Sequence, residues 1–396
     1  MPDPSQNIPA ELVKRLGNLD LSNPQDLKQL FALEAELRSI VEDDPDNIPP
    51  AEIPPEDPSL AYLAAADPTI SLDEFTKIVN DDIQQLINSQ TLLFPACITG
   101  ALDKTSWLLD QGLDLNHVDK DSYTPLIYAS LPGDRANLDL IQLLITKGAN
   151  LNATSNFDES PLKLLIRDGN YEGAQLLLTA GADPAPANFT PLHQATASGD
   201  LPNILSSLTP QTLEEQNCFE RSPWLTAIHA DQPSAAQLLQ SQGANTKVSG
   251  QTGVTPLHLA AEANACNSIP YLLQQKHNLE TRADFGNAPL HNAVENDSLE
   301  AAKLLLDAGA DVHALTESVD APISFADSLP ILRLLEKHGA NLNHLNTAGH
   351  GPLHNLAECD DLEAVTWLLG KGTNPNIPTT TFSPKIQTLI QTFQTK

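Results

Sequence analysis

The sequence of 396 residues predicts an all-α repeat solenoid, a row of similar helix-turn-helix units that stack on one another. A short segment that begins with Thr or Ser followed by Pro and Leu recurs along most of the chain. Each of these segments is followed by a second predicted helix, which carries a Leu-Leu pair and ends at a Gly. An Asn/Asp-rich stretch comes next, as in LLITKGANLN and LLLDAGADV. Self-similarity at a fixed period is the signature of repeat architectures.

The recurring segment starts at positions separated by 33, 36, 30, 32, 33, 33, 33 and 30 residues. These starts are Thr91, Thr124, Ser160, Thr190, Ser222, Thr255, Ala288, Ala321 and Gly351. The period predicts about nine units in a solenoid over residues 91–376. Unit eight is short by three residues and reads SFADSLP where a full first helix would stand.

Each unit has the local chemistry of two capped helices. The Thr or Ser hydroxyl is a favoured N-cap, and the Pro after it suits the first helical position. The Gly after the Leu-Leu pair suits a left-handed C-cap. Ala288, Ala321 and Gly351 lack the hydroxyl, and loss of such a cap costs about 0.5–2 kcal/mol. We therefore expect the C-terminal half to be the less stable half.

Four histidines follow the cap by three residues, namely His193, His258, His291 and His354. A side chain at this position can reach back to the start of the helix, as in a capping box. The position predicts a structural role for these rings rather than catalysis or metal binding.

The segments TPLHQA, TPLHLA, APLHNA and GPLHNL, with the closing GAN or GAD, resemble the ankyrin repeat. The resemblance covers residues 91 to about 376. It implies L-shaped units of two antiparallel helices with a short β-hairpin finger, stacked so that the concave face and the fingers bind a protein partner. It also implies that the four histidines tie the cap to neighbouring backbone.

The ends of the array are expected to be capped by polar helices, because a terminal unit would otherwise expose its stacking face. Residues 58–90 are predicted to form an N-terminal helical cap with a capping box from Ser71 to Glu74, and residues 377–396 a C-terminal capping helix that starts at Ser383. Residues 1–57 form an acidic, Pro-rich segment with one or two helices. Its longer helix is either a strut or a separate partner-binding or dimerising element.

The net charge of −30 argues against nucleic acid and anionic membranes as direct partners, because both attract basic surfaces. It is compatible with a basic protein partner and also with simple solubility. No apolar run approaches the ~20 residues that span a bilayer, and the N-terminus lacks a secretory pattern. The four cysteines lie far apart, which favours buried, reduced thiols and a cytoplasmic location.

The sequence contains no phosphate-binding glycine loop, no HExxH, no G-x-S-x-G elbow and no zinc-ligand spacing. It therefore predicts no enzyme activity, no cofactor, and neither catalytic nor metal-binding residues. A remote alternative is an enzyme whose site is hidden in the N-terminal segment or in an irregular unit.

The resemblance implies that partner contacts lie one, three or four residues before each segment start and seven or eight after it. On the fingers these positions are Tyr123, Phe157, Phe189, Phe219, Arg221 and Phe285, and at the first-helix ends they are Arg167, Asp168, His229, Glu262, Glu295, Asn296 and Glu358. Aromatic residues are frequent energetic anchors of interfaces. The alternative, that each Phe packs on its own hairpin, stays open here.

These residues predict a non-enzymatic module that binds a basic protein partner with an apolar spot beside its positive charge. Two biological roles compete. One is an inhibitor or immunity protein that masks a basic toxin or nuclease. The other is an adaptor, or an effector that an intracellular bacterium delivers into a host cell.

Overall fold

The computed structural model describes residues 64–67, 69–79, 92–131, 137–249, 253–377 and 382–394. The helices predicted within residues 1–57 lie outside this range. The chain divides into an N-terminal body, Met1–Leu164, and a C-terminal body, Leu165–Lys396, and each is described by itself.

The N-terminal body is built from short helices that pair along the chain. They are α4 (Leu72–Val79), α6 (Leu93–Ile98), α7 (Leu102–Asp110), α8 (Pro125–Ala129) and α9 (Leu138–Lys147), with α10 (Pro161–Arg167) at the division. The predicted capping box of α4 is confirmed: the Ser71 N–H donates to Glu74 Oε2 (3.1 Å), and the Glu74 N–H donates to Ser71 Oγ (3.3 Å). Phe75 of α4 packs edge-on against Trp107 of α7, so α4 covers the start of the repeats.

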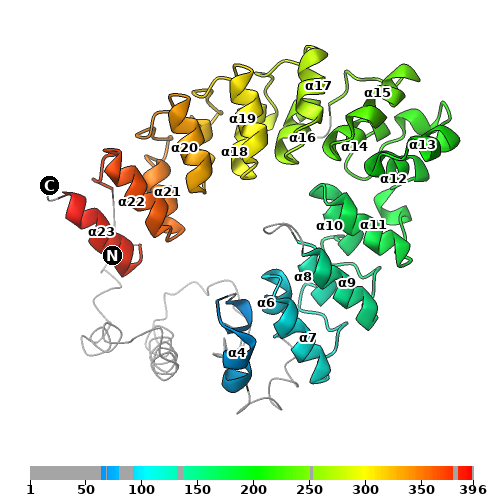
Figure 1. Ribbon diagram of the computed structural model, residues 1–396, viewed down its shortest axis with the longest axis horizontal. Coiled ribbons are helices and arrows are strands. Elements are labelled where there is room, and N and C mark those ends of the chain that lie inside the picture. The colour runs from blue at the N-terminus through cyan, green and yellow to red at the C-terminus, as the bar shows by residue number, and fades with distance from the viewer. Residues whose placement is uncertain are drawn as a thin grey trace, which may run out of the picture. The chain divides into compact units, whose positions relative to one another are not determined.

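The C-terminal body continues the same pairing. Its helices are α11 (Tyr171–Thr179), α12 (Pro191–Ser198), α13 (Leu201–Ser207), α14 (Pro223–His229), α15 (Pro233–Ser241), α16 (Pro256–Glu262), α17 (Ser268–Gln274), α18 (Pro289–Glu295), α19 (Leu299–Asp307), α20 (Leu329–Lys337), α21 (Pro352–Glu358), α22 (Leu362–Gly370) and α23 (Pro384–Gln394). The first helices α12, α14, α16 and α18 form one row and the second helices α13, α15, α17 and α19 the other (Figure 1). A continuous core, rich in Leu and Ala, is buried in this body. The described residues contain helices and turns but no β-strand.

The predicted helix starts are confirmed at atomic detail. Ser222 Oγ accepts a hydrogen bond from the Leu225 N–H (3.3 Å), and Thr190 Oγ1 accepts one from the His193 N–H (3.4 Å). The start of α23 at Ser383 is also confirmed, because its hydroxyl accepts from the Ile386 N–H (3.4 Å). The caps satisfy backbone donors that have no partner inside the helix.

Short acidic and amide side chains lock neighbouring repeats together. Asp231 and Asn264 follow first helices with left-handed φ values of 54° and 52°, which Asp and Asn tolerate better than other side chains. Asp231 Oδ1 accepts from the Ser268 N–H (2.7 Å), and Asn264 Oδ1 accepts from the Ala301 N–H (2.9 Å). Both acceptors thus cap the second helix of the following repeat. Part of the acidic composition is therefore structural.

Repeat eight confirms the predicted truncation. Its first helix is replaced by the single 3₁₀ turn η6 (Pro322–Phe325). The place of the cap histidine is taken by Ser324, and the Ala321 N–H donates instead to His344 Nε2 (3.2 Å) in the loop after α20.

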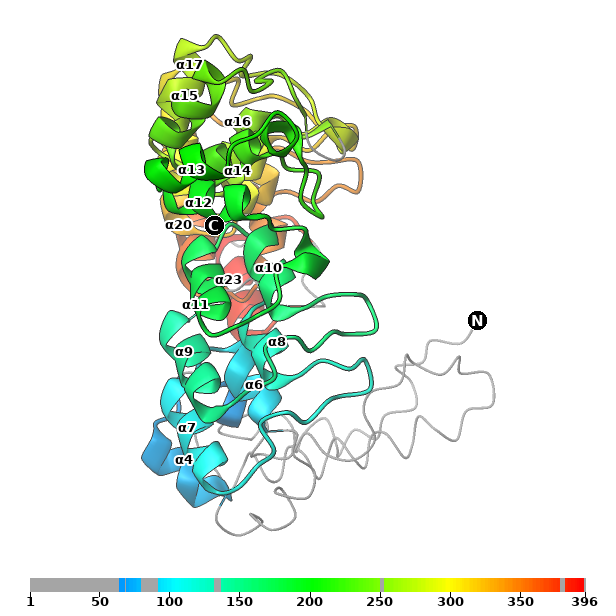
Figure 2. The ribbon, with the colours of Figure 1, turned by 90° about the vertical axis from the view of Figure 1, so that its right-hand side faces the viewer.

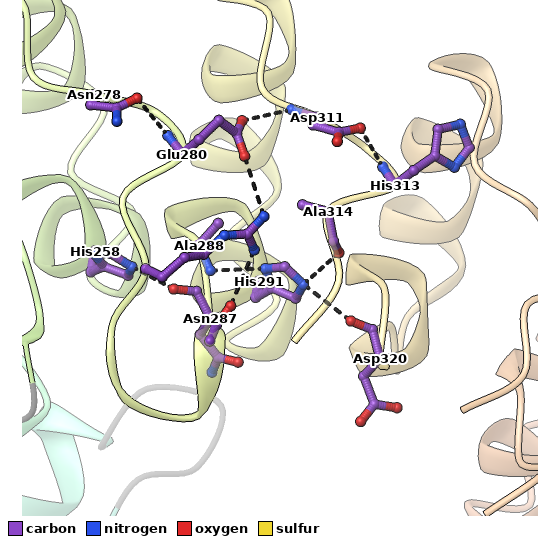
Figure 3. A network of polar contacts seen from close by, with 12 residues as sticks. His258, Asn278, Glu280, Asn287, Ala288, His291, Asp311, His313, Ala314 and Asp320 are labelled. Carbon is purple, nitrogen blue, oxygen red and sulfur yellow. Dashed lines mark hydrogen bonds and ion pairs between the residues drawn. The ribbon is translucent and has the colours of Figure 1, made fainter. Parts of the chain in front are cut away.

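The histidines after the cap connect one repeat to the next (Figure 3). The Thr255 N–H donates to His258 Nδ1 (3.1 Å), so the neutral ring carries its proton on Nε2 and donates to the Asn287 carbonyl (2.9 Å). His291 repeats this arrangement, accepting from the Ala288 N–H (3.0 Å) and donating to the Ala314 carbonyl (3.0 Å). Each ring ties a helix start to the loop that follows the next second helix.

Replacing His258 with Ala is expected to lower the free energy of unfolding by about 1–3 kcal/mol, because a buried carbonyl loses its donor. Chemical denaturation should measure this loss, and hydrogen exchange should place it in α16 and α18. His313→Ala is the matched control, since His313 is exposed in the neighbouring loop and its removal should change stability by less than about 0.5 kcal/mol. Equal stability of parent and His258→Ala would contradict the structural role.

The fingers are tight turns rather than paired strands. Short loops extend to the right of α6 and α8 in Figure 2. In one of them the Asp119 N–H donates to the Tyr123 carbonyl (3.1 Å), and Ser122 takes a left-handed φ of 64°. This is a three-residue hairpin loop with its bulge residue. The Ser122 N–H also donates to the Asp119 carbonyl (3.1 Å), so the finger is a short hairpin turn without a β-strand.

Candidate protein-binding surfaces

A cluster of aromatic rings lies in the N-terminal body, formed by Phe94, His117, Tyr123, Tyr128 and Phe157. The ring centroids of Phe94 and Tyr128 are 5.1 Å apart, those of Tyr128 and Tyr123 5.2 Å, and those of Tyr123 and Phe157 6.3 Å. His117 stacks on Phe94 at 5.8 Å. The row leads from helices α6 and α8 to the finger tip, where Phe157 is 66% exposed. We call these five residues the aromatic cluster.

Carboxylates hold the tyrosines of this cluster. The Tyr128 hydroxyl donates to Asp119 Oδ2 (2.6 Å), and the Tyr123 hydroxyl donates to Glu159 Oε2. The hydrogen bond to Glu159 raises the pKa of the Tyr123 hydroxyl. The tyrosines thus present neutral rings beside two negative charges.

Of this cluster the sequence identified Tyr123 and Phe157 but missed Phe94, His117 and Tyr128. A signal was available: Phe94 is the fourth residue of TLLFPA, and Tyr128 the fifth of TPLIYA, where most other segments carry smaller or aliphatic residues. Two bulky rings at neighbouring places on consecutive first helices are expected to meet.

A second candidate surface lies in the C-terminal body at the ends of first helices. Asp168, Glu262 and Glu295 interact electrostatically there, with Arg167 and Arg221 as the nearby cations. Burial raises the pKa of Glu262, Asp168 and Glu295 raise it further, and the two arginines oppose this shift. Burial also raises the pKa of Glu295, although its side chain keeps an exposed edge. We call Asp168, Glu262 and Glu295 the acidic group.

Arg221 and His229 do not belong to the accessible surface, and the sequence prediction for them is corrected. They are only 6% and 2% exposed. Arg221 donates to the carbonyls of Ile166 (2.9 Å) and Arg167 (3.0 Å), while His229 Nδ1 lies 2.9 Å from the Tyr171 hydroxyl. Burial and Arg221 keep the pKa of His229 well below its usual range, so its ring is neutral. Both side chains are buried and hydrogen-bonded within the core.

The predicted finger aromatics divide into three classes. Phe189 is corrected as well, because it is 2% exposed and stacks on Tyr171 at 6.1 Å. Phe219 is half-buried under the Arg221 guanidinium, 5.6 Å from the ring centroid. Phe285 is 77% exposed, with a left-handed φ of 62°. Phe157 and Phe285 are thus the accessible members.

The remaining predicted residues lie at helix ends and are accessible or partly so. Arg167 Nε donates to Asp168 Oδ1 at 3.0 Å. Glu358 is exposed and its Oε2 lies 3.8 Å from His354 Nδ1. Asn296 is exposed and donates to the Asn292 carbonyl (2.9 Å).

A hollow of about 400 Å³ opens in the C-terminal body beside Tyr171 and Phe189. Glu172 and Asp231 are among its polar lining residues. Its size falls within the range of side-chain and ligand pockets, and its lining is both aromatic and acidic.

The described residues contain no group of three His, Cys, Asp or Glu side chains that could hold a metal ion. Within the same residues, no helix has the length and apolar character to cross a membrane. None of the four cysteines forms a disulfide, and only Cys97 is buried, so the expectation of buried thiols is wrong for Cys218 and Cys359, which are exposed. Burial raises the pKa of the Cys97 thiol to about 12.

The chain has paired helices, short fingers, and histidines that join each helix start to a following loop. These features define a repeat protein of the helical solenoid class. A family profile described as "Ankyrin repeats (3 copies)" matches residues 62–155, 133–219 and 224–316, and one described as "Ankyrin repeat" matches residues 348–380. These matches cover well over half of the sequence. The chain belongs to the ankyrin-repeat family and is built as a protein–protein interaction module.

Several curated proteins are similar to this chain. It is 29% identical over 201 residues to the B-cell lymphoma 3 protein homolog of Mus musculus, covering 48% of this chain and 45% of that protein. It is 30% identical over 149 residues to Inversin of Canis lupus familiaris, covering 36% and 14%. It is 28% identical over 195 residues to Alpha-latrotoxin-Lt1a of Latrodectus tredecimguttatus, covering 46% and 14%. The match spans less than half of each relative.

Proposed function

We propose that this chain is a non-enzymatic binding protein that takes a basic protein partner on its first-helix ends and fingers. The partner surface would include Phe157 and Phe285 at finger tips, with Asp168, Glu262 and Glu295 at helix ends. Residues 91–376 would be the binding array, and residues 58–90 and 377–396 its caps. The most specific role consistent with this chemistry is inhibition, in which an acidic surface covers a basic one.

The observation that carries the proposal is the state of Glu262. Its carboxyl is half-buried, and this burial raises its pKa. Arg221 and Arg167 lower the pKa, while Asp168 and Glu295 raise it. A carboxylate in such a place lacks part of the solvation that water would supply. A cation brought by a partner would restore that stabilisation. We therefore expect a basic side chain of the partner to add to the pairing that Arg221 and Arg167 already give this group.

The overall charge supports the same partner chemistry. A net charge of −30 attracts a basic protein over several ångströms and speeds its encounter. We place the protein in the cytoplasm, or in a host cell if it is delivered there as an effector. Inspection of the gene neighbourhood separates an immunity protein from an effector, since a toxin gene directly upstream favours an immunity protein.

The proposal predicts that Glu262→Gln weakens partner binding by about tenfold or more, because charge pairs at close range in interfaces couple by about 1.5 kcal/mol or more. The partner is first captured from native cells on the tagged full chain and identified, and its binding kinetics are then measured at low and high salt. Glu363→Gln is the matched control, because this exposed acid lies on the second helix α22.

Two results would contradict the proposal. One is a Glu262→Gln variant that binds as tightly as the parent protein while Glu363→Gln does too. The other is a captured partner without a basic surface, whose affinity does not change with salt. In the latter case the negative charge would serve solubility alone.

A further inference from the structure

The aromatic cluster of the N-terminal body has the composition of a site for one cationic side chain. The geometry points to an arginine of the partner lying against Tyr123, Tyr128 and the exposed Phe157, beside the carboxylates of Asp119 and Glu159. This inference rests on the proposed function, because it names the side chain through which a basic partner would engage this body.

The rings supply the faces that a guanidinium prefers. Successive centroids lie 5.1, 5.2 and 6.3 Å apart from Phe94 through Tyr128 and Tyr123 to Phe157, so the rings adjoin one another without a gap. A cation within about 6 Å of an aromatic centroid is attracted by the electrons of the ring. The chain uses this contact internally, since the Arg221 guanidinium lies 5.6 Å from the Phe219 centroid.

The carboxylates decide between a cationic and a purely apolar ligand. The Tyr128 hydroxyl donates to Asp119 and the Tyr123 hydroxyl to Glu159, and these hydrogen bonds fix the positions of both acids. Asp119 is held further, because its Oδ1 accepts from the N–H groups of Asp121 (2.9 Å) and Tyr123 (2.8 Å). A ligand that covers the rings also meets two negative charges. An apolar segment would take water away from these carboxylates, whereas a cation would add an electrostatic attraction to them.

Arginine fits this arrangement better than lysine does. Its planar guanidinium stacks on aromatic faces and is more weakly hydrated than an ammonium group. Its fork of N–H donors can reach carboxylate oxygens while the plane stays on a ring. The site is therefore expected to rank arginine above lysine, and both above a neutral side chain of the same shape.

The test uses the full chain and three short synthetic peptides that alternate glycine with arginine, lysine or citrulline, the neutral isostere of arginine. Titration calorimetry at physiological salt is expected to show the arginine peptide binding at least tenfold more tightly than the citrulline peptide. Phe157→Leu and Tyr128→Leu keep the protein charge, and each is expected to weaken arginine binding about fivefold. Tyr128→Phe keeps the ring and should retain most of the affinity.

Leu205→Ala is the control, because it removes an exposed apolar side chain on α13 of the other body and should leave peptide binding unchanged. Phe157 is exposed, so its replacement does not threaten the fold. Equal binding of the arginine and citrulline peptides would overturn the inference, as would Leu variants that bind the arginine peptide like the parent. If those variants bind normally while Glu262→Gln still weakens the captured partner, the arginine site fails and the proposed function stands.

Discussion

Replacing Arg221 with Met is expected to lower the free energy of unfolding of the C-terminal body by about 3 kcal/mol. The guanidinium donates to the Ile166 carbonyl (2.9 Å) and the Arg167 carbonyl (3.0 Å), which are the last two carbonyls of α10. A buried acceptor left without a donor costs about 1–3 kcal/mol. The positive charge at the C-terminal end of a helix is also favourable.

Denaturant titration should measure this loss, and hydrogen exchange should show α11 and α12 opening earlier than in the parent. Arg333→Met is the control, because Arg333 is exposed on α20 and its loss should stay within about 0.5 kcal/mol. Arg221→Lys keeps the charge but not the fork of donors, and is expected to restore little stability. An Arg221→Met variant that is as stable as the parent but defective in partner binding would show instead that Arg221 belongs to the binding surface.

Acid is expected to destabilise the fold through its buried histidines. Burial lowers the pKa of His193 to about 4 and that of His291 to about 4, against about 6.5 in an unfolded chain. Between pH 6.5 and 4 the unfolded state therefore binds protons that the folded state does not bind. Stability is complete above pH 6.5 and falls as the pH drops toward 4, by about 2 kcal/mol per histidine between pH 7.5 and 5.

The comparison of parent with His291→Gln isolates this effect from the many carboxylates. The variant lacks one titrating ring, so it should be less stable at pH 7.5, and this deficit should shrink by about 2 kcal/mol at pH 5. Denaturant midpoints at several pH values would show converging curves. Parallel curves would mean that His291 is protonated in the folded state, which its Nδ1 contact with the Ala288 N–H disfavours.

The sequence could predict most of the fold because its signals are local. The hydroxyl of Ser222 meets the N–H of Leu225 within one helical turn, and the Ser71–Glu74 capping box spans the same distance. Repetition of such turns at one period then specifies the stacking. The finger conformation was less predictable, because a short turn closed by two hydrogen bonds and a longer hairpin begin with the same residues.

The candidate surface was only partly predictable, since equal positions in the repeat have unequal surroundings. Phe285 and Phe219 occupy the same place in their fingers, yet Phe285 is 77% exposed while Phe219 is half-buried against Arg221. Phe189 follows a short connection with a 3₁₀ turn, η2 (Ala185–Ala187), and is buried against Tyr171. A position in a repeat indicates where a side chain begins but not what packs over it.

By itself the sequence determined the repeat, from the spacing of its segments, and the helix caps and first contacts of the cap histidines, because these join residues three apart. Only the tertiary structure showed that Arg221 donates to the last carbonyls of α10 and that His229 is a core residue. It also showed that Phe94 and Tyr128 join Tyr123 in one cluster. Arg221 meets Ile166 from 55 positions further along the chain. Such contacts depend on how neighbouring repeats pack, and packing sets burial, hydrogen bonding and charge together.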